Sequence, residues 1–314
     1  MTSVLPLAPI PARGTAAGPV AVVAAAVLWG TAGTAGTLAL GGTADPVALA
    51  AARLVVGGAV VAVLAGLANV AAVIRSGPAR MTAAAAAAAA YQLCYFAAVT
   101  RTGVAIATVV AIGSGPVFTG LLTWSRDRER PGRRWTLATA AAVTGCAVLV
   151  SGGQASGAEP LGVLLALTGG LLYAFYAVVA ARSITGGAPS GAVMGVLFGG
   201  AAVIMLPVLL WRGTGWLAEP NGLLAAGYLG CVTTALAAYL YGRGLRATPV
   251  ARAATLTLAE PAVAALLGVL LLHERLAPVS LAGLVLLGAA LVLVAVPGRA
   301  QVPTGARGEA ESSR

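Results

Sequence analysis

The chain has 314 residues, of which 59% are hydrophobic and only 9% are charged, and its mean hydropathy is +0.94. Because a soluble domain carries about 25% charged residues, this composition predicts a protein of the lipid bilayer. All 19 basic residues are arginine. The chain therefore has neither a phosphate-binding-loop lysine nor a Schiff-base lysine, and any uphill transport must use an ion gradient or a separate ATPase subunit.

Ten apolar segments are long enough to approach the roughly 20 residues that cross the hydrocarbon core. They are residues 19–40, 47–70, 81–99, 104–124, 135–151, 160–181, 191–211, 221–241, 249–271 and 279–297. The polar linker 151–159 divides them into a first repeat, 19–151, and a second repeat, 160–297. The tails, 1–18 and 298–314, are rich in Pro, Gly and Ser, which predicts disorder. The expected fold is an all-α membrane protein with ten transmembrane helices.

One sequence pattern occurs twice, 145 positions apart, as the step from Pro116 to Pro261 shows. Each proline is followed by an apolar run that ends in Glu-Arg, first at Glu129–Arg130 and then at Glu274–Arg275. This pattern indicates two copies of one membrane module. If each copy holds five spans, the second copy must be inverted relative to the first. Transporters use such inverted repeats around a central cavity for alternating access.

The arginines predict the orientation of the chain in the membrane. With the amino terminus inside, the outer loops hold only Arg101, Arg212 and Arg275, against fourteen arginines in the inner segments. This bias follows the positive-inside rule and predicts a multi-pass cell-membrane protein with both termini cytoplasmic. The net charge of +10 is thus an orientation signal, and because the arginines are scattered over short loops no nucleic-acid partner is expected.

Few residues could support enzyme chemistry. The single histidine, His273, lies at the end of an apolar segment, where an interfacial position is the simpler interpretation. One histidine cannot form an HExxH-type zinc site. Cys94, Cys146 and Cys231 lie within apolar segments, and we expect no disulfide framework. We predict no metal, no cofactor and no enzymatic activity.

Several short motifs occur in a fixed order along the ten segments. In chain order they are Leu28-Trp29-Gly30, Asp45-Pro46 followed by Arg53, Pro116 with Glu129-Arg130, Leu172-Tyr173-Ala174, Glu260-Pro261 and His273-Glu274-Arg275-Leu276. Together, over residues 19–297, they resemble EamA-type members of the drug/metabolite transporter superfamily. The resemblance implies two inverted five-helix repeats around a central cavity and the movement, often outward, of small organic solutes. The sequence departs from the pattern at Arg126–Arg128, where an apolar lead is usual, and at Val196, where a duplicated Arg53 would fall.

Three charged residues fall inside the predicted spans: Arg53, Arg252 and Glu260. A charge at the bilayer centre costs about 2.5–3.5 kcal/mol on insertion scales, so each is a functional candidate. Arg252 lies only a few residues inside its span and is expected to snorkel to the cytoplasmic face. Arg53 and Glu260 enter from opposite sides, about 9 Å and 17 Å deep at 1.5 Å per residue. We hypothesise that they face a shared cavity and pair, in competition with solute or protons; a static ion pair or polar helix contact is the alternative.

Pro116 and Pro261 occupy matched positions inside helices, where each removes a backbone hydrogen bond. Symmetric kinks could act as hinges or expose carbonyl groups to a solute, although simple helix shaping is an equal alternative. Gly113 and Gly115 beside Pro116 favour the first kink as the looser one.

Aromatic residues make up only 5% of the chain, so their positions are informative. Trp29 and Tyr173 occupy equivalent places in the two repeats, and Tyr91 and Tyr95 share one helix face at four-residue spacing. All four are candidates for lining a cavity and stacking on a solute, with interfacial anchoring as the alternative. Weaker cavity candidates are Tyr176 and Tyr239. Interfacial anchoring is favoured for Trp124, Trp135, Trp211 and Trp216.

The sequence therefore predicts a secondary active transporter, with a small-molecule solute and the lipid bilayer as partners. We expect an exporter of small organic metabolites, amino acids or drug-like compounds, the direction being implied by the resemblance alone. Two alternatives stay open: a membrane-embedded enzyme acting on lipid or prenyl substrates, and a non-transporting scaffold or channel. The glycine stripe Gly191, Gly195 and Gly199 suits close helix packing within a monomer or, alternatively, between the subunits of a homodimer.

Overall fold

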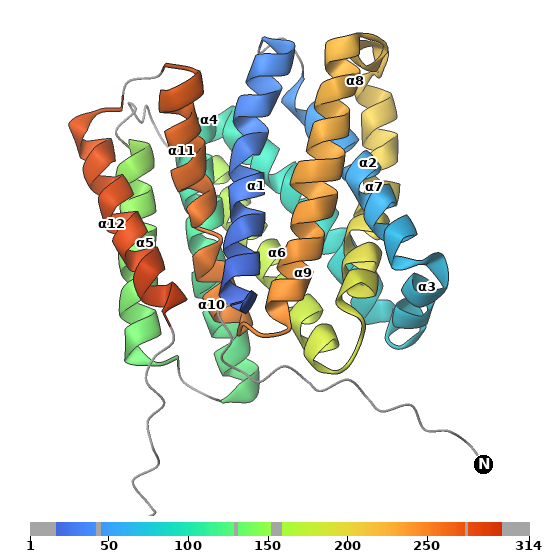
Figure 1. Ribbon diagram of the computed structural model, residues 1–314, viewed down its shortest axis with the longest axis horizontal. Helices are drawn as coiled ribbons and strands as arrows, with labels where there is room; N and C mark the ends of the chain where they lie inside the picture. Colours follow the sequence, from blue (N-terminus) through green and yellow to red (C-terminus); the bar gives the residue numbers. More distant parts are fainter. Residues whose placement is uncertain (1–16, 42–44, 129–130, 152–158, 274–275, 297–314) are drawn as a thin grey trace, which may run out of the picture.

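The computed structural model of the chain describes residues 17–41, 45–128, 131–151, 159–273 and 276–296. The Glu129–Arg130 and Glu274–Arg275 pairs and most of both predicted tails lie outside these residues. Figure 1 shows that the described elements are helices that run roughly parallel to one another. In chain order they are α1 (Ala17–Leu40), α2 (Pro46–Ala65), α3 (Leu67–Arg75), α4 (Pro78–Asp127), α5 (Arg133–Ser151), α6 (Pro160–Thr185), α7 (Ser190–Arg212), the 3₁₀ helix η1 (Gly215–Ala218), α8 (Pro220–Gly227), the π-helix η2 (Tyr228–Leu236), α9 (Ala237–Leu245), α10 (Val250–Leu256), α11 (Ala259–Leu271) and α12 (Pro278–Ala295).

Within the described part of the chain, eight helical stretches are long and apolar enough to cross a membrane. Two of them are composite, because α8, η2 and α9 form Pro220–Leu245 and α10 with α11 forms Val250–Leu271. α4 counts once although two spans are predicted there. α5, which begins with Arg133 and Arg134, does not count among the eight.

α4 reverses its direction at Gly103. The backbone there has φ 78° and ψ 162°, a conformation that glycine adopts far more readily than other residues. On the two sides of the reversal, the Tyr95 and Thr108 hydroxyls lie 2.9 Å apart, whereas 13 residues of straight helix would separate them by about 20 Å. α4 is therefore a pair of antiparallel arms. The predicted segments 81–99 and 104–124 match these arms.

The predicted span 47–70 is wrong at its carboxyl end. α2 stops at Ala65 because Gly66 has φ 80° and ψ 120°, and the short helix α3 follows it as a separate element. The amino end of α2, at Pro46, lies within one residue of the predicted start of this span. Asp45 caps α2 by accepting a hydrogen bond from the Val47 amide at 2.9 Å, and Pro46 occupies the first turn.

Helices from the two predicted repeats pack against each other in antiparallel pairs. α5 lies beside α12 at the left of Figure 1. A Cβ atom at Gly145 would lie 2.6 Å from the Leu287 amide nitrogen, and one at Gly283 would collide with the Leu149 amide nitrogen. The two contacts are reciprocal, since a glycine of each helix meets a leucine of the other. Such reciprocity is what a twofold relation between equivalent helices produces.

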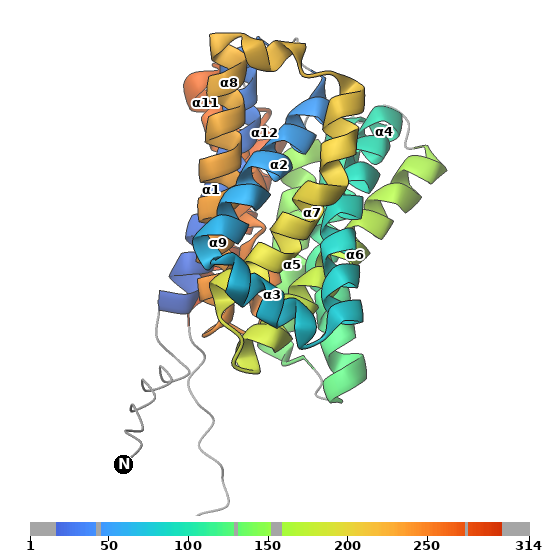
Figure 2. The ribbon, with the colours of Figure 1, turned by 90° about the vertical axis from the view of Figure 1, so that its right-hand side faces the viewer.

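α2 and α7 form a second antiparallel pair, seen side by side in Figure 2. An ion pair at 3.1 Å joins Asp45, at the start of α2, to Arg212, at the end of α7. The glycine stripe of α7 contributes to this contact. Gly195 and Gly199 approach Ala62 of α2, so they pack within the chain, whereas Gly191 faces open space.

The backbone carries a repeat at the same spacing as the sequence. Among the described residues, Arg128 and His273 are the non-glycine residues with positive φ, at 59° and 56°. They are 145 positions apart and follow α4 and α11 respectively. The left-handed conformation is uncommon outside glycine, and its occurrence at these two equivalent helix ends indicates that both repeats end their fourth span in the same way.

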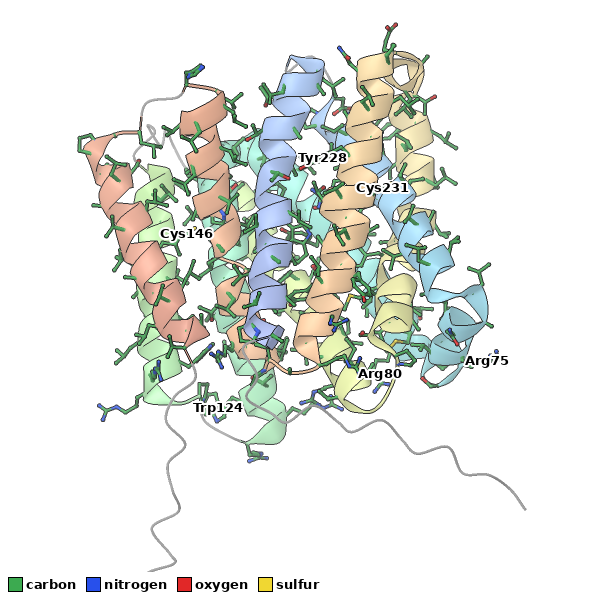
Figure 3. All side chains as sticks on the ribbon, in the orientation of Figure 1. Arg75, Arg80, Trp124, Cys146, Tyr228 and Cys231 are labelled. Carbon is green, nitrogen blue, oxygen red and sulfur yellow. The ribbon has the colours of Figure 1, made fainter. Side chains whose placement is uncertain are left out.

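The two ends of the bundle are distinguishable. In Figure 1, α1 begins and α12 ends toward the lower end, and Figure 3 shows Arg75, Arg80 and Trp124 at that end as well. The Gly103 turn and the end of α11 lie toward the opposite, upper end, because each is reached from the lower end along one helix arm.

Candidate functional site

A cavity of about 800 Å³ lies between α1, α2, α4, α6 and α11. Its lining comes from the second half of α1 (residues 29–40), the first half of α2 (46–54), both arms of α4 (88–112) and α11 up to Leu272. These segments all adjoin the upper end of the bundle. The cavity therefore extends from the middle of the molecule toward its upper end, and its volume is in the range of small-molecule sites.

All the residues proposed from the sequence as substrate-binding candidates line this one cavity. They are Trp29 of α1, Arg53 of α2, Tyr91 and Tyr95 of α4, Tyr173 of α6 and Glu260 of α11. Five helices, from both predicted repeats, thus contribute to a single lining.

The aromatic side chains form a connected wall. The rings of Tyr91 and Tyr95 stack at 6.3 Å with 30° between their planes, and Tyr91 meets Tyr173 at 6.2 Å. Trp29 contacts Tyr241 at 5.4 Å, and the Tyr173 and Tyr241 hydroxyls lie 3.2 Å apart. Ring pairs at these separations attract each other beyond simple burial. The wall is therefore held in place by its own contacts and is pre-organised for a flat or apolar solute.

The inner end of the cavity is closed by a small hydroxyl cluster. Tyr173 lies within hydrogen-bonding distance of both the Tyr241 hydroxyl and the Thr257 hydroxyl, at 3.2 and 3.3 Å. Thr257 lines the cavity, but Tyr241 is only 1% exposed and lies behind the lining. Below this level the interior is filled by side chains, among them Leu245 and Leu256.

Arg53 and Glu260 share the cavity but do not form the ion pair expected from the sequence. Both are described residues, and no nitrogen–oxygen distance between them is within 4.0 Å. The Arg53 Nε atom is buried and has no hydrogen-bond partner among the described residues. The expectation of a direct pair was wrong because sequence gives depth along a helix, whereas pairing depends on side-chain separation across the cavity.

The helix is interrupted just before Pro261. α10 ends at Leu256 and α11 begins at Ala259. Because Pro261 has no amide hydrogen, the Thr257 carbonyl instead accepts a hydrogen bond from the Glu260 amide at 3.0 Å. Pro116, in contrast, lies within a continuous arm of α4 and does not line the cavity. The helix is thus interrupted beside Pro261, in the second repeat. The sequence had favoured Pro116, in the first repeat, as the looser of the two kinks.

The glycine of the Leu28-Trp29-Gly30 motif has a packing role at the site. A Cβ atom at Gly30 would lie 2.7 Å from the Glu260 carbonyl oxygen and 2.8 Å from the Val263 Cβ. α1 can therefore lie directly against α11 only because residue 30 lacks a side chain. This contact places Trp29 and Glu260 in the same region of the cavity.

Arg252, expected to snorkel to the cytoplasmic face, extends to the carboxyl end of α12 at the lower end of the bundle. Its Nε donates to the Val294 carbonyl at 2.6 Å and its Nη2 donates to the Ala295 carbonyl. Arg134 donates to the neighbouring Leu293 carbonyl at 3.0 Å. Two arginines thus cap the carboxyl end of α12, where unpaired carbonyls and the helix dipole both favour cations.

Several lining residues were missed by sequence reasoning: Gln92, Phe96, Thr108, Phe198 and Thr257. A signal existed for Gln92, the one glutamine inside any predicted span.

Of the weaker aromatic candidates, Tyr176 lines the cavity, whereas Tyr239 is 49% exposed and does not. Trp124 and Trp211 are exposed as interfacial anchors would be, but Trp135 donates to the Ala251 carbonyl at 3.2 Å.

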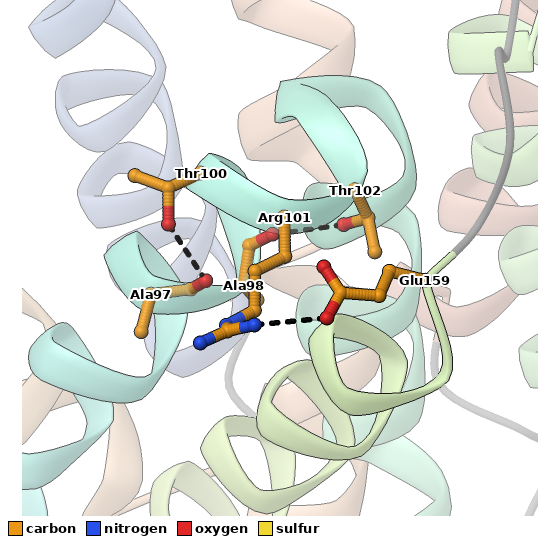
Figure 4. Close-up of polar contacts among 6 residues, drawn as sticks. All are labelled: Ala97, Ala98, Thr100, Arg101, Thr102 and Glu159. Atoms are coloured by element: carbon orange, nitrogen blue, oxygen red, sulfur yellow. Dashed lines mark hydrogen bonds and ion pairs between the residues drawn. The ribbon is translucent and has the colours of Figure 1, made fainter.

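An ion pair ties two elements together at the upper rim. Figure 4 shows Arg101, at the turn of α4, donating to the Glu159 carboxylate at 2.8 Å. Thr102 beside it donates to the Ala98 carbonyl at 3.0 Å, and Thr100 donates to the Ala97 carbonyl at 2.9 Å. The Arg101–Glu159 pair joins the α4 turn to the start of α6, and the two threonine bonds lie within α4 itself.

No metal or redox centre is indicated within the described residues, where no three His, Cys, Asp or Glu side chains gather to hold an ion. Cys94, Cys146 and Cys231 are free thiols. The cavity lining offers charged groups, hydroxyl groups and aromatic surface.

Comparison with known proteins identifies the chain. The family model described as "EamA-like transporter family" matches twice, over residues 16–151 and 160–296. An uncharacterized transporter, YwfM of Bacillus subtilis (strain 168), is 36% identical over 218 residues, which cover 69% of this chain and 73% of YwfM. A crystal structure whose description names no function superposes with a TM-score of 0.75 at 22% identity, covering 88% of this chain and 95% of the other.

The helical fold, the apolar spans and the central cavity are those of a multi-pass membrane transporter. More narrowly, the chain belongs to the EamA-like transporter family, and each half matches the family once.

Proposed function

We propose that the chain is a secondary active transporter that exports small organic metabolites, amino acids or drug-like compounds by alternating access. The observation that carries this proposal is the cavity of about 800 Å³, lined by residues of both halves in a chain of a transporter family. Its aromatic wall and its two charged groups offer a solute both apolar surface and polar partners, the usual composition of a ligand site.

The proposed architecture is ten crossing helices arranged as two inverted five-helix repeats, 19–151 and 160–297. The two arms of α4 and helix α5 bring the eight apolar stretches to ten crossings. The antiparallel pairing of α5 with α12 and of α2 with α7 supports inversion, because a twofold relation between antiparallel helices turns one repeat upside down. The double match of the family model supports the duplication.

Both termini are proposed to be cytoplasmic in a cell-membrane protein. Arg75 and Arg80 lie at the end of the bundle where α1 begins, as the positive-inside rule expects for the inner face. The cavity extends toward the other end, which is the outer face in this orientation. An exporter in this conformation would release its solute outward.

Reconstitution of the purified protein into liposomes tests the transport function. A panel of amino acids, nucleosides and antibiotics is offered, and we expect saturable flux of at least one compound above that of protein-free liposomes. The Trp29→Ala variant should raise the KM for that solute, since part of the aromatic wall is lost. Trp211→Ala is the matched control, because Trp211 is 81% exposed and lies away from the cavity. Flux equal to that of protein-free liposomes for every compound contradicts the proposal.

Reporter fusions test the orientation. A reporter placed after residue 314 should be cytoplasmic, and one placed near residue 155 should be extracytoplasmic. The reverse result would show that the cavity extends toward the cytoplasm.

A further inference from the structure

The charge in the cavity lining is confined to one cation and one anion. Among the residues that line the cavity, Arg53 and Glu260 are the charged ones, and they come from different repeats. The rest of the lining is aromatic, aliphatic, glycine or uncharged polar. The lining therefore presents one guanidinium and one carboxyl group, on separate helices.

Neither charge is neutralised by contact with the protein. Arg53 and Glu260 do not pair with each other, and the buried Arg53 Nε has no hydrogen-bond partner in the described chain. Other buried or half-buried polar groups near the site do have partners, as the Tyr173, Thr257 and Tyr95 hydroxyls show. A buried donor without a partner is costly, and such sites mark places where a ligand completes the hydrogen bonding.

Resting on the transport function proposed above, we propose that Arg53 and Glu260 form a two-point charge clamp that selects dipolar solutes. The Arg53 guanidinium takes the anionic group of the solute, preferably a carboxylate, which fits its fork of donors. The Glu260 carboxylate takes the cationic group, preferably an ammonium. A solute with one charge would satisfy one residue and leave the other dehydrated without a partner, which costs more than the pair gained.

The aromatic wall fixes where the body of such a solute lies. Tyr91 of α4 lines the same cavity as Arg53 and Glu260, so the aromatic wall and the clamp share one site. Tyr91 stacks with Tyr95 and meets Tyr173, which extends the aromatic surface along the cavity lining. The expected ligand thus has an acidic group, a basic group and an apolar or aromatic body.

The first test compares compounds that share one skeleton but differ in charge. L-phenylalanine carries both groups, phenethylamine only the cation and 3-phenylpropionate only the anion. In proteoliposomes, we expect dipolar members of the solute panel to be exchanged fastest, and L-phenylalanine to be exchanged at least about tenfold faster than either analogue. If the solutes exchanged fastest carry one charge or none, the clamp is overturned while the transport function stands. If nothing is exchanged, the transport function itself fails.

The second test reads the role of each charge separately. Arg53→Gln leaves Glu260 as the charged partner, so this variant should favour phenethylamine over 3-phenylpropionate. Glu260→Gln should reverse that preference. Matched controls are Arg75→Gln and Glu219→Gln, both exposed and outside the cavity, which should retain the wild-type order. A purely structural role would lower all three fluxes by one common factor in both variants, and that result would overturn the clamp.

Discussion

The two ends of the helix bundle differ in how closely equivalent helices approach each other. Toward the lower end, α6 contacts α9 and α10, and at the inner end of the cavity Tyr173 meets Tyr241. At the upper end, the helix equivalent to α6 in the proposed repeats is α1, and α1 and α4 both line the cavity. One repeated pattern thus supports a closed and an open packing in the same molecule, which is the condition that alternating access requires.

Other contacts are alike at the two ends. A Cβ atom at Gly18 of α1 would lie 2.6 Å from the Thr248 hydroxyl, and a Cβ atom at Gly162 of α6 would collide with Thr102. Gly18 and Gly162 are 144 positions apart, and each begins its helix beside the turn between two others. The groups α1–α9–α10 and α4–α6 are therefore tightly packed units. The difference between the ends lies in how these units meet, not in how each is built.

The largest expected loss of stability is at a close contact of the packed end. A Cβ atom at Gly244 would lie 2.6 Å from a Val22 methyl and 3.0 Å from the Gly18 carbonyl oxygen. Gly244→Ala should destabilise the protein by about 1–3 kcal/mol through overpacking. Gly33→Ala is the matched variant on the cavity side, because a Cβ atom at residue 33 would meet nothing within 4 Å. Alanine has a higher helix propensity than glycine, so this variant should be more stable than the wild type by up to about 1 kcal/mol. Thermal unfolding in detergent measures the stability of both variants. If both variants lose stability, or both gain it, the proposed difference in packing between the two ends is contradicted.

A smaller loss is expected where Arg252 caps α12. Arg252→Gln removes charged donors from the Val294 and Ala295 carbonyls, while the Arg134 bond to Leu293 is retained. One hydrogen bond to a charged group contributes about 1.5–3 kcal/mol, and because Arg252 is only partly buried we expect a total loss toward the lower part of that range. Arg75→Gln is the control, because Arg75 is exposed and bonds its own helix. Equal unfolding midpoints for the two variants would contradict the capping role.

The smallest effect is expected at the upper rim. Arg101 and Glu159 pair at 2.8 Å, but their side chains are 42% and 44% exposed. Exposed pairs contribute about 0–1 kcal/mol because water and salt screen them. Glu159→Gln should therefore shift the unfolding midpoint only slightly, and the shift should vanish in high salt. A loss as large as that of Gly244→Ala would show that the upper rim is as tightly held as the packed end.

Much of the candidate site could be predicted from residue type alone. Charged residues inside apolar spans are rare because they are costly, so Arg53 and Glu260 stand out in the sequence itself. The scarcity of aromatic residues makes Trp29, Tyr91 and Tyr173 conspicuous in the same way. All of these line the cavity. The helical class and most span boundaries followed from hydropathy and length.

The remaining features depend on geometry that the sequence does not encode locally. The turn of α4 at Gly103 was marked by the polar residues Thr100, Arg101 and Thr102, whereas Gly66 ends α2 within an apolar run, so no polar loop marked that place. The π-helix η2 has no periodic signature of its own. The missing Arg53–Glu260 pair and the Arg252 cap were unpredictable because side-chain partners are set by distances of a few ångströms between helices that are far apart in sequence.

The central claim, that the two ends open alternately, is tested most directly by paired distances between spin labels in liposomes. One pair, Thr185→Cys with Arg246→Cys, spans α6 and the end of α9 at the packed end; the other, Thr37→Cys with Thr100→Cys, spans α1 and the α4 turn at the cavity end. All of these positions are exposed, and labelled protein must retain solute flux. For each pair we predict a population with a short distance and a population with a long distance. When solute is added, the long-distance population should grow for one pair and shrink for the other. Distances that stay fixed during flux, or that lengthen together, would contradict the account.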